Sequence, residues 1–374
     1  MKSLPELLLK RLPQSLSKTC VLLKSMALAA SAASLMLVTP AMAQDRPQFK
    51  LGYVVYVGFM PLAWMKAEGL MQKWGDKYGV DVELVQVNDY VGSINQFIAG
   101  DLDAVAVAGM DALTMPAAAG VDTSIFLIAD YSNGNDMLLS RSATEVKDLV
   151  GQEVWLLQYS VSHYLLTRAL AKAGIEDPSS VKTTNISDTE IAAAYVTQPD
   201  MAHVATWNPM ASEMIAQVPE TKVLFDSSAI PGEIMDVFIA KTDTLTKSPE
   251  FAKAVTGAWY EALATLSGAD NGPMIDTMAS AMGTDAAGFK MQMDDTHFFL
   301  TGAEAAEFLI AETTAQTMDL VRTFSFDQGL FGQGAASVDT VGIALGNGTV
   351  LGDTNNVMLR FDPSFAQMSA KGEL

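Results

Sequence analysis

The sequence predicts an α/β fold in which helices flank largely parallel sheets. From Leu51 onward, short apolar runs typical of buried strands alternate with amphipathic helical patterns. A polar break at 132–136 interrupts this alternation, which then starts again and runs to a second break at 230–234. The chain has 374 residues, of which 49% are hydrophobic and 18% charged. It can therefore bury a core sufficient for one large domain or two medium ones.

Before the first break, four apolar runs predict strands at 51–57, 80–87, 104–108 and 123–129. The segments between them place apolar residues at helical spacing, which predicts helices at 61–78, 91–99 and 111–118. Pro61 stands at the first position of the first helix, where its fixed φ favours a helix start.

After the first break, strands are expected at 153–157, 181–184, 203–206 and 222–225, and helices at 160–173, 188–197 and 209–216. Asp188 is expected to cap its helix, with Glu190 close behind. A strand at 236–240 follows the second break, and the chain is expected to be mostly helical from there to about residue 322. The Gly- and Asn-rich tail 327–356 predicts loops with little regular structure.

An internal similarity indicates two like-built lobes. The segment 100–109, GDLDAVAVAG, aligns with 199–208, PDMAHVATWN, since each has a helix end, an Asp and a short buried strand. The alternative is a chance similarity between two strand–helix units. If the similarity is real, Trp207 and Asn208 hold the places in the second lobe that Ala108 and Gly109 hold in the first.

The first 43 residues have the pattern of a secretory signal peptide. Five Lys or Arg residues precede the apolar run 25–38, and small residues follow at 41–43. We expect cleavage before Gln44 and export, with a retained N-terminal anchor as the alternative. No later segment approaches the roughly 20 apolar residues that a membrane-spanning helix needs.

The net charge restricts the partners. The chain carries a formal net charge of −20, and removal of residues 1–43, whose net charge is +4, leaves −24. Nucleic acid and anionic membranes are therefore poor partners. The negative charge fits either a solvated surface or a cationic ligand. Cys20 is the only cysteine and lies in the segment to be removed, so we expect no disulfide and no thiolate metal site.

Five motifs resemble the periplasmic substrate-binding proteins of ABC importers, in the nitrate, sulfonate and taurine group. They are GFMPLAWMKAEGL (58–70), QFIAGDLD (96–103), GMDA (109–112), DLVGQEV (148–154) with HYLL (163–166), and ATWNP (205–209). Within that group, Asp89-Tyr90 and the segment Arg360-Phe-Asp362 are similar to the branch associated with urea carboxylase operons, which implies guanidinium or urea as ligand.

The resemblance implies a two-lobed periplasmic binding protein fold with two crossing hinge strands that closes around its ligand. The lobes would comprise 44–132 with 236–374, and 133–235. The protein would capture a small nitrogen-rich solute, guanidinium first and urea second, and deliver it to a permease driven by an ATPase. We expect a monomer without catalysis, cofactor or metal.

In open α/β sheets, ligands bind beyond the carboxyl ends of the strands. In the first lobe this rule selects the residues that follow three strands: Gly58, Phe59, Asp89, Tyr90, Met110 and Asp111. In the second lobe and at the return crossing it selects Tyr159 to Ser162, Asp188, Trp207, Asn208, Glu233 and Asp236. Trp64 in the first turn of its helix lies about 70° from the centre of the apolar face. We expect it to lean toward the cleft, and packing against a neighbouring loop is the alternative.

The selected loops contain acids and aromatic residues but no Lys or Arg. Binding of a sulfonate or nitrate would favour Arg, Lys or a free helix N-terminus, and only the helix start at Ser160 offers the last. A planar cation would instead favour carboxylates in its plane and an aromatic face above it. The carboxylate candidates are Asp89, Asp111, Glu233 and Asp236, and the stacking candidates are Trp64, Tyr159 and Trp207. Asp111 as a simple helix cap is the alternative to its binding role.

Two other constellations are rejected. Ser160 and Ser162 beside His163 cannot easily form a nucleophile–base pair within one helical turn, so capping is expected there. His297 follows two acids but lacks a second histidine at metal-ligand spacing, so 294–297 is expected to be a turn. Three alternatives stay open: a sulfonate, taurine or nitrate ligand, an enzyme on the same fold as in pyrimidine-synthesising relatives, and a sensory module.

Overall fold

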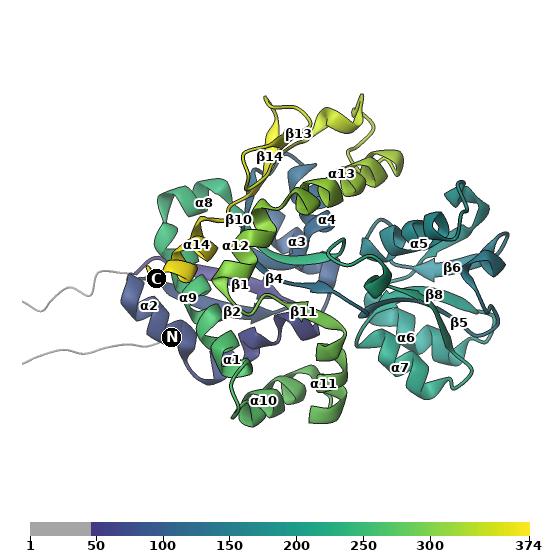
Figure 1. The fold of residues 1–374 in the computed structure, drawn as a ribbon, viewed down its shortest axis with the longest axis horizontal. Coiled ribbons are helices and arrows are strands. Elements are labelled where there is room, and N and C mark those ends of the chain that lie inside the picture. Colours follow the sequence, from purple (N-terminus) through teal and green to yellow (C-terminus); the bar gives the residue numbers. More distant parts are fainter. Residues whose placement is uncertain (1–45) are drawn as a thin grey trace, which may run out of the picture. The chain divides into compact units, whose positions relative to one another are not determined.

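The structure is a computed structural model that describes residues 46–374. The predicted signal peptide and its cleavage site lie outside the described residues. The described chain forms two β-sheets with helices packed on their faces (Figure 1). Among the helices of this part of the chain, none is long and apolar enough to cross a membrane.

The larger sheet has nine strands in the order β13-β12-β14-β4-β10-β3-β1-β2, with β11 paired to β4. The strands β1, β2 and β3 run parallel, whereas β10 runs antiparallel to both of its neighbours. The bounds are β1 (Gln48–Tyr53), β2 (Asp81–Gln86), β3 (Ala104–Ala108), β4 (Thr123–Ser132), β10 (Met235–Lys241), β11 (Thr296–Phe298), β12 (Gly342–Ala344), β13 (Val350–Leu351) and β14 (Val357–Phe361).

Eleven helices belong to the chain segments that build this sheet. They are α1 (Pro61–Ala67), α2 (Leu70–Tyr78), α3 (Tyr90–Ala99), α4 (Gly109–Ala112), α8 (Thr242–Lys247), α9 (Pro249–Leu266), α10 (Gly272–Met282), α11 (Ala286–Asp294), α12 (Gly302–Ile310), α13 (Glu312–Asp327) and α14 (Ser364–Lys371). Aromatic contacts join helix to sheet in the core: the Trp259 ring of α9 meets Phe238 of β10 edge-on, with ring centroids 5.0 Å apart. These buried aromatic pairs fix α9 against the centre of the sheet.

The smaller sheet has five strands in the order β7-β6-β8-β5-β9. Its elements are β5 (Asp136–Ser140), β6 (Glu153–Leu156), β7 (Lys182–Asn185), β8 (His203–Trp207), β9 (Lys222–Asp226), α5 (Val161–Lys172), α6 (Asp188–Thr197) and α7 (Met210–Gln217). Figure 1 shows α5 on one face of this sheet and α6 with α7 on the other. Successive strand residues point to opposite faces, so Leu138 packs in the α5 cluster and Leu139 in the α6–α7 cluster.

Short helical turns complete the chain: η1 (Val57–Phe59), η2 (Leu113–Ala117), η3 (Val146–Leu149), η4 (Pro178–Ser180), η5 (Ser227–Ala229) and η6 (Val338–Thr340). The chain leaves the larger sheet after β4, builds the smaller sheet from β5 to β9, and returns to the larger sheet as β10. The predicted α/β fold class, with two sheets that contain parallel strands, flanking helices and two crossing segments, is confirmed, and each sheet also contains antiparallel pairs.

The polar break at 132–136 lies at the first crossing, where residues 133–135 connect β4 to β5. Its polar groups are bonded inside the protein: the Ser132 hydroxyl, for example, bonds to the Ser227 hydroxyl at 2.7 Å and accepts from the Asp136 N–H at 3.1 Å. One prediction near the crossings was wrong, because the expected turn at 294–297 is the end of α11 and strand β11, which pairs with β4.

Three further predictions were wrong in detail. The helix expected at 61–78 is two helices, since Gly69 lies between them with a left-handed φ of 66°. The tail 327–356 contributes β12 and β13, which extend the larger sheet through β14. Ser187 caps α6, and Asp188 is the first helical residue.

Candidate functional site

A small cavity lies where loops from both sheets meet. Its lining comes from the ends of β1, β3 and β8, from the starts of β5, β10 and α5, and from α3: Val54, Tyr56, Phe59, Tyr90, Ala108, Asp136, Val161, Trp207, Ile234 and Asp236. The cavity volume is about 30 Å³. One water needs about 10–15 Å³ by the same measure, so the cavity takes a molecule of a few non-hydrogen atoms.

Two buried acids face each other on adjacent strands beside this cavity. Asp236 of β10 stands directly opposite Asp130 of β4 in the antiparallel register. The Tyr56 hydroxyl donates to Asp130 Oδ1 at 3.1 Å. A Cβ at Gly58 would collide with Asp130 Oδ2, so this loop approaches the carboxyl closely because residue 58 is glycine. Asp236 lines the cavity and Asp130 lies behind it.

The smaller sheet brings a third acid and an aromatic wall. Asp136 at the start of β5 pairs with Trp207 at the end of β8. Both side chains line the cavity. The Trp207 ring also contacts the Tyr90 ring of α3 edge-on, with centroids 6.0 Å apart. The chain segments of each sheet therefore contribute an acid and an aromatic residue to the lining of the cavity.

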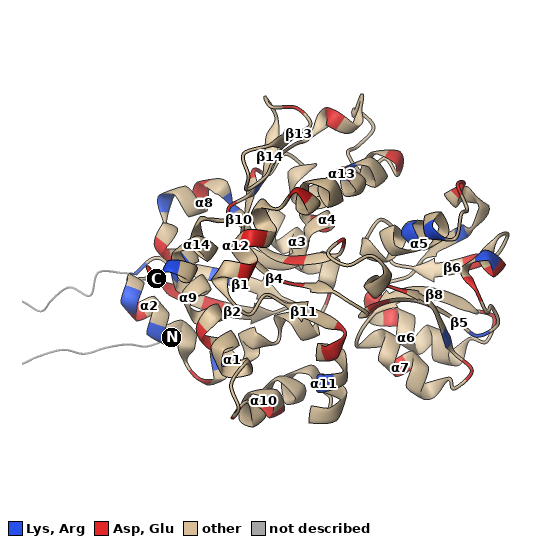
Figure 2. Ribbon diagram, viewed as in Figure 1, with Lys and Arg blue, Asp and Glu red and all other residues tan. Residues whose placement is uncertain are grey.

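The electrostatics of the cavity are dominated by unpaired carboxyls. Burial raises the pKa of Asp136 to about 6 and that of Asp130 to about 8. Burial, followed by repulsion from Asp130 and Asp136, raises the pKa of Asp236 well above its ordinary value. Figure 2 shows Lys and Arg on α2, α5 and α8, and none of the ten lining residues is basic.

A second cavity shares Tyr90 with the first. It is lined by Tyr90, Val91, Asp111, Thr114, Met115, Leu157, Gln158, Tyr159, Ser160 and Leu330. The Tyr90 hydroxyl donates to Asp111 Oδ2 at 2.7 Å and accepts from the Ala108 N–H at 3.0 Å. Burial raises the pKa of Asp111 to about 7, although the bond from Tyr90 opposes this shift. Tyr159 is half exposed and has a φ of 68°, a left-handed conformation that is uncommon outside glycine.

Five of the nine predicted ligand contacts lie at these cavities. Phe59, Trp207 and Asp236 line the first cavity, and Asp111 and Tyr159 line the second. The alternative for Asp111, a helix cap, is wrong because the residue is buried inside α4 and its carboxylate is bonded to Tyr90.

The other four predicted residues line neither cavity. Asp89 is exposed and caps α3 by accepting from the Gly92 N–H. Trp64 is half-buried against the main core, on a helix that packs against α9 and α10. Asn208 is buried and holds a loop, since its Nδ2 donates to Asn135 Oδ1 at 2.9 Å and its Oδ1 accepts from the Ser212 N–H at 3.0 Å.

Glu233 is engaged in a local ion pair. Its carboxylate accepts from Arg168 Nε at 2.6 Å, from Arg168 Nη2 at 2.9 Å and from the Tyr164 hydroxyl at 2.6 Å. Arg168 and Tyr164 belong to α5 of the smaller sheet, whereas Glu233 lies on the return segment. This planar, two-point pair joins α5 to the return segment.

The sequence prediction missed three residues of the first site: Tyr56, Asp130 and Asp136. Asp136 fell inside the supposed polar break, and Asp130 stood one residue beyond the predicted strand 123–129. A signal was present for both, since each is an acid beside a buried strand without a neighbouring Lys or Arg in the sequence. Their juxtaposition with Asp236 depends on strand register, which the sequence pattern does not reveal.

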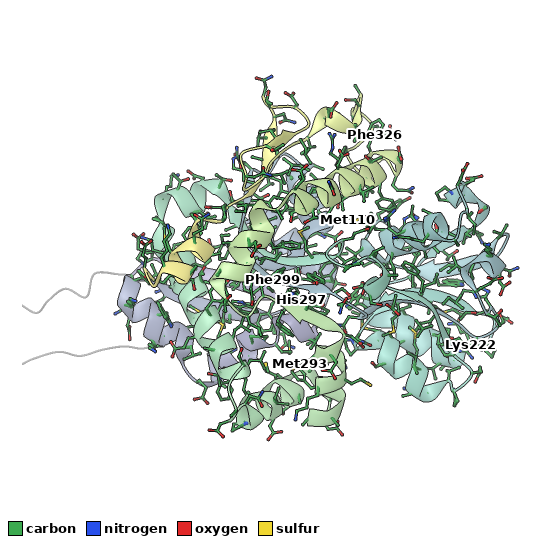
Figure 3. All side chains as sticks on the ribbon, viewed as in Figure 1. Met110, Lys222, Met293, His297, Phe299 and Phe326 are labelled. Atoms are coloured by element: carbon green, nitrogen blue, oxygen red, sulfur yellow. The ribbon has the colours of Figure 1, made fainter. Side chains whose placement is uncertain are left out.

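The rejected constellations show structural roles in the residues described. Ser160 caps α5, accepting from the Ser162 N–H at 3.2 Å. Burial lowers the pKa of His163 to about 4. The His297 ring stacks on Tyr131, with centroids 4.4 Å apart, and Figure 3 shows it beside Phe299. Within 46–374, no three His, Cys, Asp or Glu side chains are arranged to hold a metal ion.

Comparisons with known proteins identify relatives of this chain. The taurine-binding periplasmic protein of Escherichia coli (strain K12) is 26% identical over 180 residues, which are 47% of this chain and 54% of that protein. The match thus spans about half the length of this curated relative. In addition, the NMT1-like family matches residues 42–280.

Solved structures share the fold. The alkanesulfonate-binding protein from Xanthomonas axonopodis pv. citri bound to MOPS aligns with a TM-score of 0.62 and 18% identity, covering 76% of this chain and 94% of that one. The periplasmic nitrate-binding protein from Synechocystis PCC 6803 aligns with a TM-score of 0.55 and 14% identity, covering 88% and 99%. The fold is that of two-lobed periplasmic binding proteins, and the chain belongs to the NMT1-like family.

Proposed function

We propose that this protein is the periplasmic solute-binding component of an ABC importer and that it captures guanidinium in the acidic, aromatic cavity. The lobes 44–132 with 236–374, and 133–235, would close around the ligand, since the lining residues come from both sheets. The loaded protein would then deliver its ligand to a membrane permease, without a catalytic step.

The observation that carries this proposal is the composition of the cavity. Two carboxyls, Asp136 and Asp236, line it together with four aromatic rings, and no Lys or Arg is among the lining residues. Guanidinium is a planar cation whose N–H groups point outward in its plane and whose faces bind aromatic rings. Carboxylates at the edge and rings above the plane therefore match both of its binding modes.

The size of the cavity favours guanidinium over larger amines, because the space accepts only a few non-hydrogen atoms. Urea has a similar shape and is the second candidate ligand. Urea lacks the positive charge, so it does not offset the free-energy cost of burying ionised carboxylates without a counter-ion. We therefore expect urea to bind more weakly than guanidinium.

A specific observation favours the competing ligand class. The name of the curated relative states taurine binding, and one of the solved structures is alkanesulfonate-binding. Val161, the first residue of α5, lines the cavity, so the N-terminal backbone of that helix is near enough to receive an anionic group. A sulfonate bound there would still lie beside Asp136 and Asp236 without a basic residue to offset them.

The test is a thermal-shift series on residues 44–374 with guanidinium, urea, methylamine, taurine, an alkanesulfonate and nitrate, each at low millimolar concentration and matched ionic strength. A ligand at a thousand times its Kd adds about 4 kcal/mol of stability. We expect guanidinium to raise the Tm by several degrees, urea less, and the anions not at all. A shift with only taurine or another anion would overturn the proposed ligand.

A further inference from the structure

Two of the three acids around the cavity have a buried carboxyl oxygen without a donor. Within residues 46–374, Asp130 Oδ2 and Asp136 Oδ1 are buried and accept no hydrogen bond from an N–H or O–H group. Buried polar atoms are nearly always bonded, so two such atoms at one site need an explanation. Asp130 itself has no exposed surface and does not line the cavity.

The charged and titratable groups around Asp130 and Asp236 cannot neutralise them. In the part of the chain that the structure describes, the groups that act on this pair are Tyr56 from the loop after β1, Asp136 from β5 and Tyr90 from α3. Across the strands, Ala108 of β3 stands opposite Asp236 and Phe298 of β11 stands opposite Asp130. All of the titratable neighbours are acids or phenols.

Two carboxyls that face each other in a buried site cannot both ionise. We propose that Asp130 and Asp236 share one proton in the empty protein and that an entering cation displaces this proton to solvent. Because of this exchange, Asp130 makes the site prefer a cation to a neutral molecule of the same shape. This inference rests on the proposed function. Asp130 is a positioning residue, because it acts through Asp236.

The charge balance of the exchange is simple. One cation enters, one proton leaves, and the charge of the site stays constant. Burial and the repulsion between the two carboxyls raise the pKa at which the pair loses its last proton, so the shared proton is held at neutral pH in the empty site. Guanidinium keeps its own charge over this range, so its affinity rises as pH rises through the raised pKa of the pair and then levels off. Urea brings no charge and displaces no proton.

The test is isothermal titration of the protein with guanidinium at pH 6, 7 and 8, in buffers of different ionisation heats. We expect release of about one proton per guanidinium below the raised pKa of the pair, and an affinity that rises by up to about tenfold per pH unit there. Urea should show neither effect. Asp130→Asn keeps the shape of the side chain, removes most of the proton release and reduces the ratio of guanidinium to urea affinity. The exposed Asp200→Asn variant is the matched control and should behave as wild type.

The outcomes separate this inference from the proposed function. Binding of guanidinium without proton release, or an unchanged pH profile in Asp130→Asn, would overturn the shared proton and leave the proposed ligand standing. If guanidinium does not bind, the pair is tested by the ligand-free Tm between pH 5 and 9. Carboxyls whose pKa is raised in the folded state lose stabilising protons as pH rises through that pKa, so the Tm should fall with pH. Asp130→Asn should flatten this fall, and equal slopes would reject the pair.

Discussion

Two acids of the return segment, Glu233 and Asp236, stand three residues apart, but Glu233 has a basic partner and Asp236 has none among the residues described. Glu233 has its carboxylate held by Arg168 and Tyr164, with donor–acceptor distances of 2.6–2.9 Å. Asp236 is 8% exposed and faces two further acids and no base among the residues described. Both are candidate ligand contacts by their place in the sequence, but only Asp236 lines a cavity in the structure.

The comparison shows what a buried charge needs. A carboxylate that finds a guanidinium group within the protein contributes to the attachment of one part of the chain to another. A carboxylate without such a partner raises the energy of the empty protein until a proton or a ligand neutralises it. Arg168 itself carries a guanidinium group, so the Glu233 pair is an internal example of the contact that we propose for the ligand.

The largest expected effect is on ligand affinity, from Asp236→Asn. Removing one partner of a buried charge pair costs about 3 kcal/mol, which is about a hundredfold in Kd for guanidinium. The ligand-free Tm should stay the same or rise, because the variant removes a buried acid that has no counter-ion. Titration calorimetry and thermal melting measure the two quantities. Retention of wild-type affinity by Asp236→Asn would exclude this carboxyl as the ligand's partner.

Arg168→Met removes the cation from Glu233, and we expect this variant to lose stability while it keeps its affinity for guanidinium. The side chains of the pair are 20% and 12% exposed, so the loss of stability is about 2 kcal/mol, less than for a fully buried pair. The affinity for guanidinium should change far less than in Asp236→Asn, since Arg168 does not line the cavity. A Tm equal to that of wild type would show that the ion pair does not contribute to stability.

The fold class and several residues that line the two cavities could be predicted from the sequence because both depend on local pattern. Alternating strands and helices identify the carboxyl ends of strands, and ligands bind there. Phe59, Asp111 and Trp207 stand at such ends, and the structure places each at one of the two cavities. Neither the register of β4 against β10 nor the position of α5 near the return segment is a local property. Asp130 opposite Asp236 and Arg168 beside Glu233 were therefore beyond the reach of the pattern.

Trp64 is a second residue whose contacts depend on distant parts of the chain and not on the local sequence. The helical wheel gives its angle from the apolar face but does not say which neighbouring elements cover each face. The helices α9 and α10 that pack against α1 come about two hundred residues later in the chain. A tryptophan near a sheet edge can therefore lie toward the cleft or against another helix, with the same local sequence.

The smallest expected effect distinguishes two tryptophans that the sequence analysis ranked together. Trp207→Leu removes an aromatic wall of the cavity, and the lost contact between cation and ring should cost about 1 kcal/mol, or about fivefold in Kd for guanidinium. Trp64→Leu should leave the Kd within about twofold, because the residue lies outside both cavities. Its Tm should fall instead, since Trp64 packs against the main core. Titration of both variants with guanidinium measures the two affinities. A larger loss of affinity in Trp64→Leu than in Trp207→Leu would mean that the ligand binds on the α1 side and that the acidic cavity is not its site.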